Sequence, residues 1–141
     1  MKHLRNFNEG KSNNFLEELK NFSNNNLAFL LDKGFKVDIE HNPFRNISEI
    51  YIFTGNFIVF NWEDVKYDII PFLIELDRKY NMVPPTNAWD HFFNPDKKMI
   101  YMFKSNLDSI NSKWYYDVDE IRYDMVELPE KIEQILINIK E

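Results

Sequence analysis

The chain has 141 residues, a formal net charge of −6 and no cysteine. Disulfides, thiolate metal sites and cysteine nucleophiles are therefore excluded, and the acidic balance argues against direct nucleic-acid binding, which depends on Lys and Arg neutralising phosphates. This length is typical of one domain, so we expect a single domain over residues 1–141, in which residues 1–11 could be flexible.

The first part of the sequence predicts a helix followed by strands. Residues 12–34 carry apolar side chains at helical spacing, begin with the cap-type residue Ser12 and stop at Gly34, with a bend expected at residues 24–26. Strict alternation of apolar and polar residues then favours strands. Residues 35–42 are interpreted as one strand, and residues 47–55 and 57–60 as one or two more.

Residues 61–80 give the clearest helical pattern, with Asn61 as the cap and Asp64 at the third helical position. Pro71 lies in its interior, so we expect a bend near Tyr67 to Pro71. The remaining segments are interpreted as a strand (97–104), one or two strands (114–128) and a closing helix (129–141). This order predicts an α+β fold, with a mainly antiparallel sheet and about three helices packed largely on one face.

No apolar run approaches the 18 residues of a membrane span, and the N-terminus lacks the apolar core of a signal peptide. We therefore expect a cytoplasmic protein that makes no membrane contact.

Few residues offer familiar catalytic chemistry. The three histidines are His3, His41 and His91, and although His41, His91 and Asp90 could converge on a metal, ordinary loop histidines are the favoured interpretation. There is no Gly-x-Ser-x-Gly elbow, and three glycines in the chain leave no phosphate-binding loop. We expect no metal, no cofactor and no enzymatic activity.

The stretch NAWDHFFNPDKK, residues 87–98, reads as a structured loop because prolines flank it and interrupt it. Trp89, Phe92 and Phe93 could cap the open end of the sheet, which is the favoured interpretation, or belong to an exposed aromatic patch for binding a protein. The other candidates for that patch are Tyr51, Phe53, Trp114, Tyr115 and Tyr116.

Acidic residues concentrate between Asp117 and Glu133, where Arg122 and Lys131 are the only cations. Asp117, Asp119, Glu120 and Asp124 form the candidate acidic face. If these carboxylates share one exposed surface, they could imitate DNA phosphates and occupy a nucleic-acid-binding site on another protein.

The segments MKHLRNFNE, NNLAFLLDKGFKVDI and FNWEDVKYDIIPFLIELDRKY resemble a pattern in small uncharacterised accessory proteins encoded by bacteriophages. The resemblance covers about half the chain, and its motifs form core, so it carries over no functional residue. It implies host-takeover or anti-defence proteins that act by binding in the host cytoplasm.

The sequence thus favours a non-enzymatic protein that binds a host or phage protein, and a homodimer is possible. A small-ligand-binding protein, an enzyme without familiar motifs and an acidic nucleic-acid mimic stay open. A pocket lined by Trp and Tyr would favour the small ligand over a flat binding patch.

Overall fold

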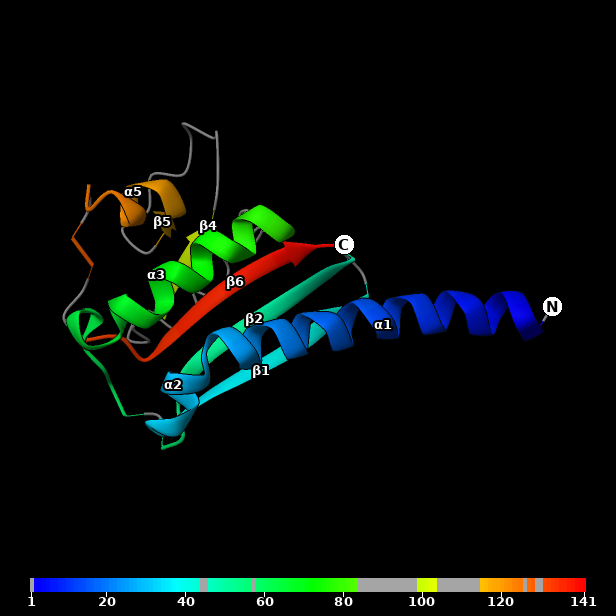
Figure 1. Ribbon diagram of the computed structural model, residues 1–141, viewed down its shortest axis with the longest axis horizontal. Coiled ribbons are helices and arrows are strands. Elements are labelled where there is room, and N and C mark those ends of the chain that lie inside the picture. The colour runs from blue at the N-terminus through cyan, green and yellow to red at the C-terminus, as the bar shows by residue number, and fades with distance from the viewer. Residues whose placement is uncertain are drawn as a thin grey trace.

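A computed structural model arranges the described residues as helices on one mixed sheet (Figure 1). It describes residues 2–43, 46–56, 58–83, 99–103, 115–125, 127–128 and 131–141, with the backbone alone for 2–13, 99–103 and 115–117. The helices are α1 (Lys2–Asn26), α2 (Ala28–Asp32), α3 (Trp62–Lys79) and α5 (Val118–Arg122). The strands are β1 (Phe35–Asn42), β2 (Ile47–Thr54), β3 (Asn81–Val83), β4 (Met99–Phe103), β5 (Tyr115–Asp117) and β6 (Gln134–Lys140).

The sheet is built around β6, the last strand of the chain. Its order is β1-β2-β6-β4-β5, and β3 also pairs with β6. The pairs β1–β2, β2–β6 and β3–β6 are antiparallel, whereas β4 is parallel to both β6 and β5. The prediction of an α+β fold with a mainly antiparallel sheet is confirmed.

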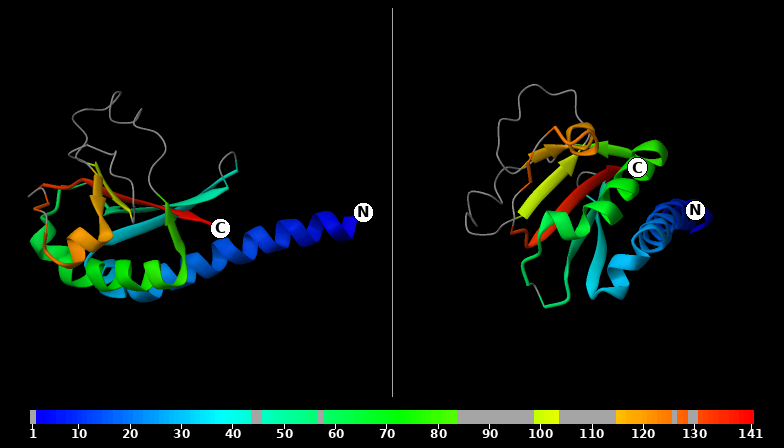
Figure 2. Two further views of the ribbon diagram at one scale, coloured as in Figure 1. Left: turned by 90° about the horizontal axis from the view of Figure 1, so that it is seen from above. Right: turned by 60° about the vertical axis from the view of Figure 1, so that its left-hand side comes forward.

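Helices α1, α2 and α3 lie along one face of the sheet (Figure 2). Strand alternation supplies that face: Ile50 and Ile52 of β2 and Ile135, Ile137 and Ile139 of β6 have no exposed surface. They share one apolar core with residues from the three helices. Each fully buried side chain of this size stabilises the fold by about 1.5–3 kcal/mol relative to exposure. The core residues contributed by these three helices are Leu19, Leu30, Trp62, Val65, Ile69, Phe72, Leu73 and Leu76.

Helix α3 begins as its sequence predicts. The Asn61 side chain accepts a hydrogen bond from the Glu63 amide at 3.2 Å, which satisfies one of the free N–H groups of the first turn. Pro71 is exposed, and the helix continues through it to Lys79. A proline on the solvent side loses one backbone hydrogen bond without placing its ring against the core.

The start of β1 is held close to the end of β2 by two glycines. Gly34 has a φ of 94°, a left-handed conformation that favours glycine and that directs the chain from α2 into β1. The Gly55 amide donates a hydrogen bond of 3.0 Å to the Gly34 carbonyl, and a Cβ on Gly55 would lie 3.3 Å from that oxygen. The predicted helix stop at Gly34 is therefore confirmed, although the helix is divided at Leu27 into α1 and α2.

The predicted C-terminal helix over 129–141 is wrong, because Gln134–Lys140 forms strand β6. Ile135, Ile137 and Ile139 alternate onto the helix-covered face, and Leu136 on the other face is also buried. A strand with both faces buried reads as a nearly continuous apolar run, which sequence periodicity does not distinguish from a buried helix. The helix was expected because Pro129 is a residue typical of the first turn of a helix and because charged residues flank the segment.

Three further boundaries differ from the sequence-based expectation. Helix α1 begins at Lys2, so Ser12 lies within it rather than capping it. In 57–60, no strand forms over the described residues, and Phe60 makes one isolated bridge with Ile132. Residues 114–128 contain the short strand β5 followed by α5 rather than strands alone. Local propensity is weak over such short segments, and tertiary pairing decides their structure.

Tyr80 closes the core beyond the end of α3. Its ring makes edge-on contacts with Phe15 and Phe22 of α1, at centroid distances of 5.8 and 5.4 Å. Its hydroxyl oxygen is buried and has no hydrogen-bond partner. Burial raises the pKa of the Tyr80 phenol above its ordinary value of 10.0, and the nearby carboxylate of Glu18 adds to the rise.

We expect Leu73→Ala and Trp62→Ala to lower the free energy of unfolding by on the order of 2–5 kcal/mol, because each leaves a cavity in the core. Leu73 is 1% exposed and Trp62 is 7% exposed. Chemical denaturation followed by circular dichroism measures the change, with Arg78→Ala on the exposed side of α3 as the control. A wild-type midpoint for Leu73→Ala would contradict the packing described.

We expect Tyr80→Phe to raise the free energy of unfolding at neutral pH by up to about 1 kcal/mol, because it removes a buried hydroxyl without a partner. Below pH 10 the phenol is neutral in both states. As the pH rises through and above 10, the unfolded Tyr80 ionises more readily than the folded one, whose pKa is raised, so stability falls as pH rises. Denaturation at pH 7 and pH 11 should show a smaller alkaline loss in Tyr80→Phe than in wild type. An unchanged loss would mean that Tyr80 is solvated.

Candidate functional site

The aromatic patch expected from the sequence falls mostly outside the described residues. Trp89, Phe92, Phe93 and Trp114 lie there, and for Tyr115 and Tyr116 the backbone of β5 alone is described. Of the other two candidates, Phe53 is buried, which corrects its assignment to an exposed patch. Tyr51 is half-buried, and its hydroxyl donates a hydrogen bond to Glu49. The patch around Trp89 stays a prediction.

The candidate acidic face begins at the end of β5 and continues over α5. Asp119, Glu120 and Asp124 are exposed, whereas Asp117 is placed by its backbone in β5. Val118 and Ile121 are 2% and 3% exposed, so one side of this single-turn helix is anchored in the core. The carboxylates next to these anchors consequently point away from the core.

A tight turn follows α5 and presents two large side chains to solvent. Asp124 has a φ of 57°, its amide donates to the Ile121 carbonyl at 3.2 Å, and the Met125 amide donates to the Glu120 carbonyl at 2.8 Å. This pair of bonds is the Schellman ending of a helix, with Asp in the position that glycine usually takes. Tyr123 is 62% exposed and Met125 is 70% exposed.

Tyr67 adds a third exposed apolar group from the neighbouring helix α3, with 79% of its surface exposed. We call the combined region the α3–α5 surface. It consists of Glu63, Tyr67, Asp119, Glu120, Tyr123, Asp124, Met125 and Glu127. Glu63, Asp124, Met125 and Glu127 line one hollow of this surface, and Lys66, next to Tyr67, interacts with the charge of Asp124.

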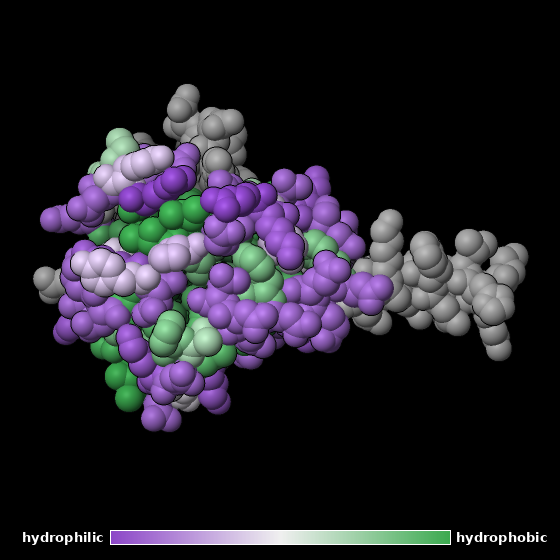
Figure 3. All heavy atoms as spheres, in the orientation of Figure 1, coloured by the Kyte–Doolittle hydropathy of each residue, from purple (hydrophilic) through white to green (hydrophobic). Residues whose placement is uncertain are grey.

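A hollow of about 560 Å³ lies within the α3–α5 surface, between the first turn of α3 and the chain after α5. Figure 3 shows an apolar strip between α3 and α5, bordered by hydrophilic residues. The hollow is lined by Asn61, Trp62, Glu63, Asp124, Met125, Glu127 and Leu128. Its carboxylates, with no cationic side chain among the described residues that line it, suit a positively charged group.

Two cations lie over the two tyrosines of this surface. Lys66 is 5.2 Å from the centre of the Tyr67 ring, and Arg122 is 5.1 Å from that of Tyr123. The Lys66 ammonium also lies 2.8 Å from Glu63, and this hydrogen bond raises the pKa of Lys66 above its ordinary value of 10.5, with desolvation opposing it. Lys66 therefore stays charged and offsets Glu63, and the surface as a whole remains acidic.

The described residues include no candidate metal-binding centre. No group of three His, Cys, Asp or Glu side chains among them is placed to hold a metal ion. His41 is exposed on β1, while Asp90 and His91 lie outside the described residues. In the same part of the chain, no helix is both long and apolar enough to cross a membrane.

Neither a protein family, nor a curated protein, nor a solved structure was found to match this chain. Functional residues therefore cannot be transferred from relatives. The functional assignment rests on the geometry and charge of the chain itself.

The sequence contained signals for the apolar part of the α3–α5 surface. Tyr67 lies outside the apolar stripe of α3, so a helical projection places it on the solvent side. Tyr123 and Met125 alternate with acidic residues in a segment that was interpreted as strand. The contact between α3 and α5 could not be inferred, because it joins segments that are distant in the sequence.

We expect the thermal midpoint of unfolding to be the same with and without EDTA, because the described side chains include no metal-binding group. Differential scanning calorimetry of the protein as purified measures this. A fall of several degrees with EDTA would contradict the expectation. His41, Asp90 and His91 would then be the candidate metal ligands.

Proposed function

We propose that this chain is a non-enzymatic binding protein whose partner is another protein, contacted through the α3–α5 surface. The observation that carries the proposal is the exposure of Tyr67, Tyr123 and Met125 on elements that are otherwise anchored in the core. Tyrosine and methionine are enriched at the centres of protein interfaces, where desolvated apolar groups supply most of the binding energy.

The charge of the surface defines the class of partner. Asp119, Glu120, Asp124 and Glu127 are exposed around the apolar groups. A partner that presents an apolar side chain flanked by Lys or Arg would complement both features, and the carboxylates would speed its association. Self-association through a two-fold axis is disfavoured, because it would place one acidic surface against another.

An acidic nucleic-acid mimic is supported less well by the same residues. Such a mimic needs an uninterrupted row of carboxylates to reproduce phosphate spacing. Here Tyr123 and Met125 interrupt the row, and Arg122 and Lys66 partly neutralise it. Mixed apolar and acidic contact is therefore the form of binding that we propose.

The resemblance to bacteriophage accessory proteins supports a more specific form of the proposal. In that setting, the partner would be a host protein that the chain inhibits by occupying its surface. A basic surface is common on proteins that act on nucleic acid. A host nuclease or nucleic-acid-binding protein is the class of partner with the required charge.

The first step of the test is to capture partners from host lysate with the tagged protein and to measure dissociation constants for each purified partner. Three variants separate the possible surfaces. The apolar part of the α3–α5 surface is tested by Tyr67→Ser with Met125→Ser, and its acidic part by Asp119→Asn with Glu120→Gln and Asp124→Asn. The loop at residues 87–98 is tested by Trp89→Ala with Phe92→Ala. Phe29→Ser is the matched control, because Phe29 is 74% exposed on α2 and does not belong to the α3–α5 surface.

We expect the Tyr67/Met125 variant to dissociate about 5- to 30-fold faster, because it loses about 1–2 kcal/mol of desolvated contact, with its melting temperature preserved. The charge variant should mainly associate more slowly, and raising the salt concentration from 50 to 500 mM should have the same effect. Loss of binding through the Trp89/Phe92 variant alone would assign the contact to that loop and overturn the proposed surface. If the affinity fell steeply with salt and the Tyr67/Met125 variant bound like wild type, the acidic mimic would be favoured.

A further inference from the structure

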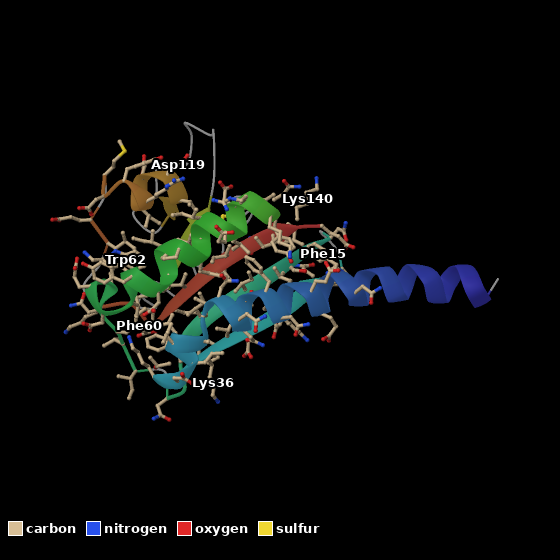
Figure 4. All side chains as sticks on the ribbon, in the orientation of Figure 1. Phe15, Lys36, Phe60, Trp62, Asp119 and Lys140 are labelled. Carbon is tan, nitrogen blue, oxygen red and sulfur yellow. The ribbon has the colours of Figure 1, made fainter. Side chains whose placement is uncertain are left out.

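A second hollow lies at the end of the sheet where β1 begins, β2 ends and α3 starts. Its volume is about 590 Å³. Figure 4 places Phe60 at this end of the molecule, far from Lys140 at the other end of β6. We call it the end pocket. It is lined by Lys33, Phe35, Thr54, Val59, Phe60, Asn61, Asp64, Val65 and Lys131.

The floor of the end pocket is apolar and fixed in place. Phe35 and Phe60 pack edge to face, with ring centres 5.1 Å apart. The Phe60 backbone forms two hydrogen bonds of 2.8 Å with Ile132, which hold the ring at the foot of the sheet. Val65 closes the floor from α3, and Val59 remains 41% exposed at the mouth. A preformed apolar floor binds a flat ligand at little cost in conformational entropy.

The rim of the end pocket carries polar groups that include two lysines, in a chain whose net charge is −6. The Lys33 ammonium lies 3.5 Å from Asp68, a long contact, and its side chain is 57% exposed, so it can turn toward a ligand. Lys131 is exposed and forms no ion pair with another described residue. Asp64 is the one carboxylate among the described lining residues, and Asp68 faces Lys33 from outside the lining.

We propose that the end pocket binds a small organic anion with a flat apolar body, such as an aromatic carboxylate or sulfonate. The rings of Phe35 and Phe60 would contact the apolar body, and Lys33 and Lys131 would pair with the anionic group. The Thr54 hydroxyl donates to the Ile58 carbonyl at 2.8 Å, which orders the lip of the pocket. Polar groups at the edge of an apolar floor are the arrangement that gives small-molecule sites their orientation and specificity.

This site is independent of the proposed protein contact. The end pocket has two lysines at its rim, whereas the described residues that line the hollow in the α3–α5 surface include carboxylates and no cation. Asn61 borders both hollows, so no test variant includes it. Failure of one proposal leaves the other unaffected, because the lysine variant of the end pocket shares no residue with the variants of the α3–α5 surface.

The test compares two probes with the same apolar skeleton. 8-Anilino-1-naphthalenesulfonate carries a sulfonate, and N-phenyl-1-naphthylamine does not. Fluorescence titration of the folded protein should give saturable binding of the sulfonate, about tenfold tighter than that of the neutral probe, the size expected of a hydrogen bond to a charged group. Amide chemical shifts of the isotopically labelled protein should change around residues 33–35, 58–61 and 131–132.

The variant Lys33→Gln with Lys131→Gln should lose the preference for the sulfonate while it retains the affinity for the neutral probe. Lys140→Gln is the matched control, because Lys140 is an exposed lysine at the opposite end of β6. Met125→Ser tests whether the dye binds the α3–α5 surface instead. Equal affinity for the two probes would overturn the proposal, and so would chemical-shift changes confined to other residues. The proposal would also be overturned if Lys140→Gln lost the preference for the sulfonate to the same extent as the double variant, or if Met125→Ser lost dye binding.

Discussion

The fold depends on the pairing of β6 along both of its edges. Strand β2 occupies one edge, while β3 and β4 divide the other, with β3 opposite Ile139 and β4 opposite Ile135. An unpaired backbone group in this buried strand would cost about 1–3 kcal/mol. Strand β6 must therefore insert between β2 on one side and β3 and β4 on the other, all of which precede it by many residues. Such non-local pairing slows folding.

The dependence on β6 explains which parts of the fold could be predicted from the sequence. Helix α3 has a cap at Asn61 and a stripe from Trp62 to Leu76, and both signals are local. Strand β1 alternates in the same local way. In β6 the apolar run is continuous, because helices cover one face and Leu136 is buried on the other. Its identity as a strand follows from partners that a local pattern does not contain.

The candidate surface was predictable to a smaller extent than the fold. The carboxylates of Asp119, Glu120 and Asp124 stood out as a run of charge, and their exposure follows from the burial of Val118 and Ile121. The apolar half of the surface depends on the turn at Asp124 and on the packing of α5 beside α3. The turn directs Met125 outward because a left-handed residue reverses the chain there. Neither feature has a sequence signature, since glycine is absent from the turn.

One polar residue in β6 specifies how the strand is placed. Asn138 is 9% exposed, lies in register with Glu49 of β2, and its side-chain oxygen has no hydrogen-bond partner. A shift of β6 by one residue would turn Asn138, Gln134 and Lys140 onto the face that the helices cover. Burying these polar groups without partners costs far more than the single unpartnered oxygen in the observed register. The polar residues Gln134, Asn138 and Lys140, which share the face opposite Ile135, Ile137 and Ile139, therefore fix the register of β6, although Leu136 on their face is apolar. That register in turn positions Ile132 to hold Phe60 at the floor of the end pocket, so the central strand and the proposed ligand site depend on the same register.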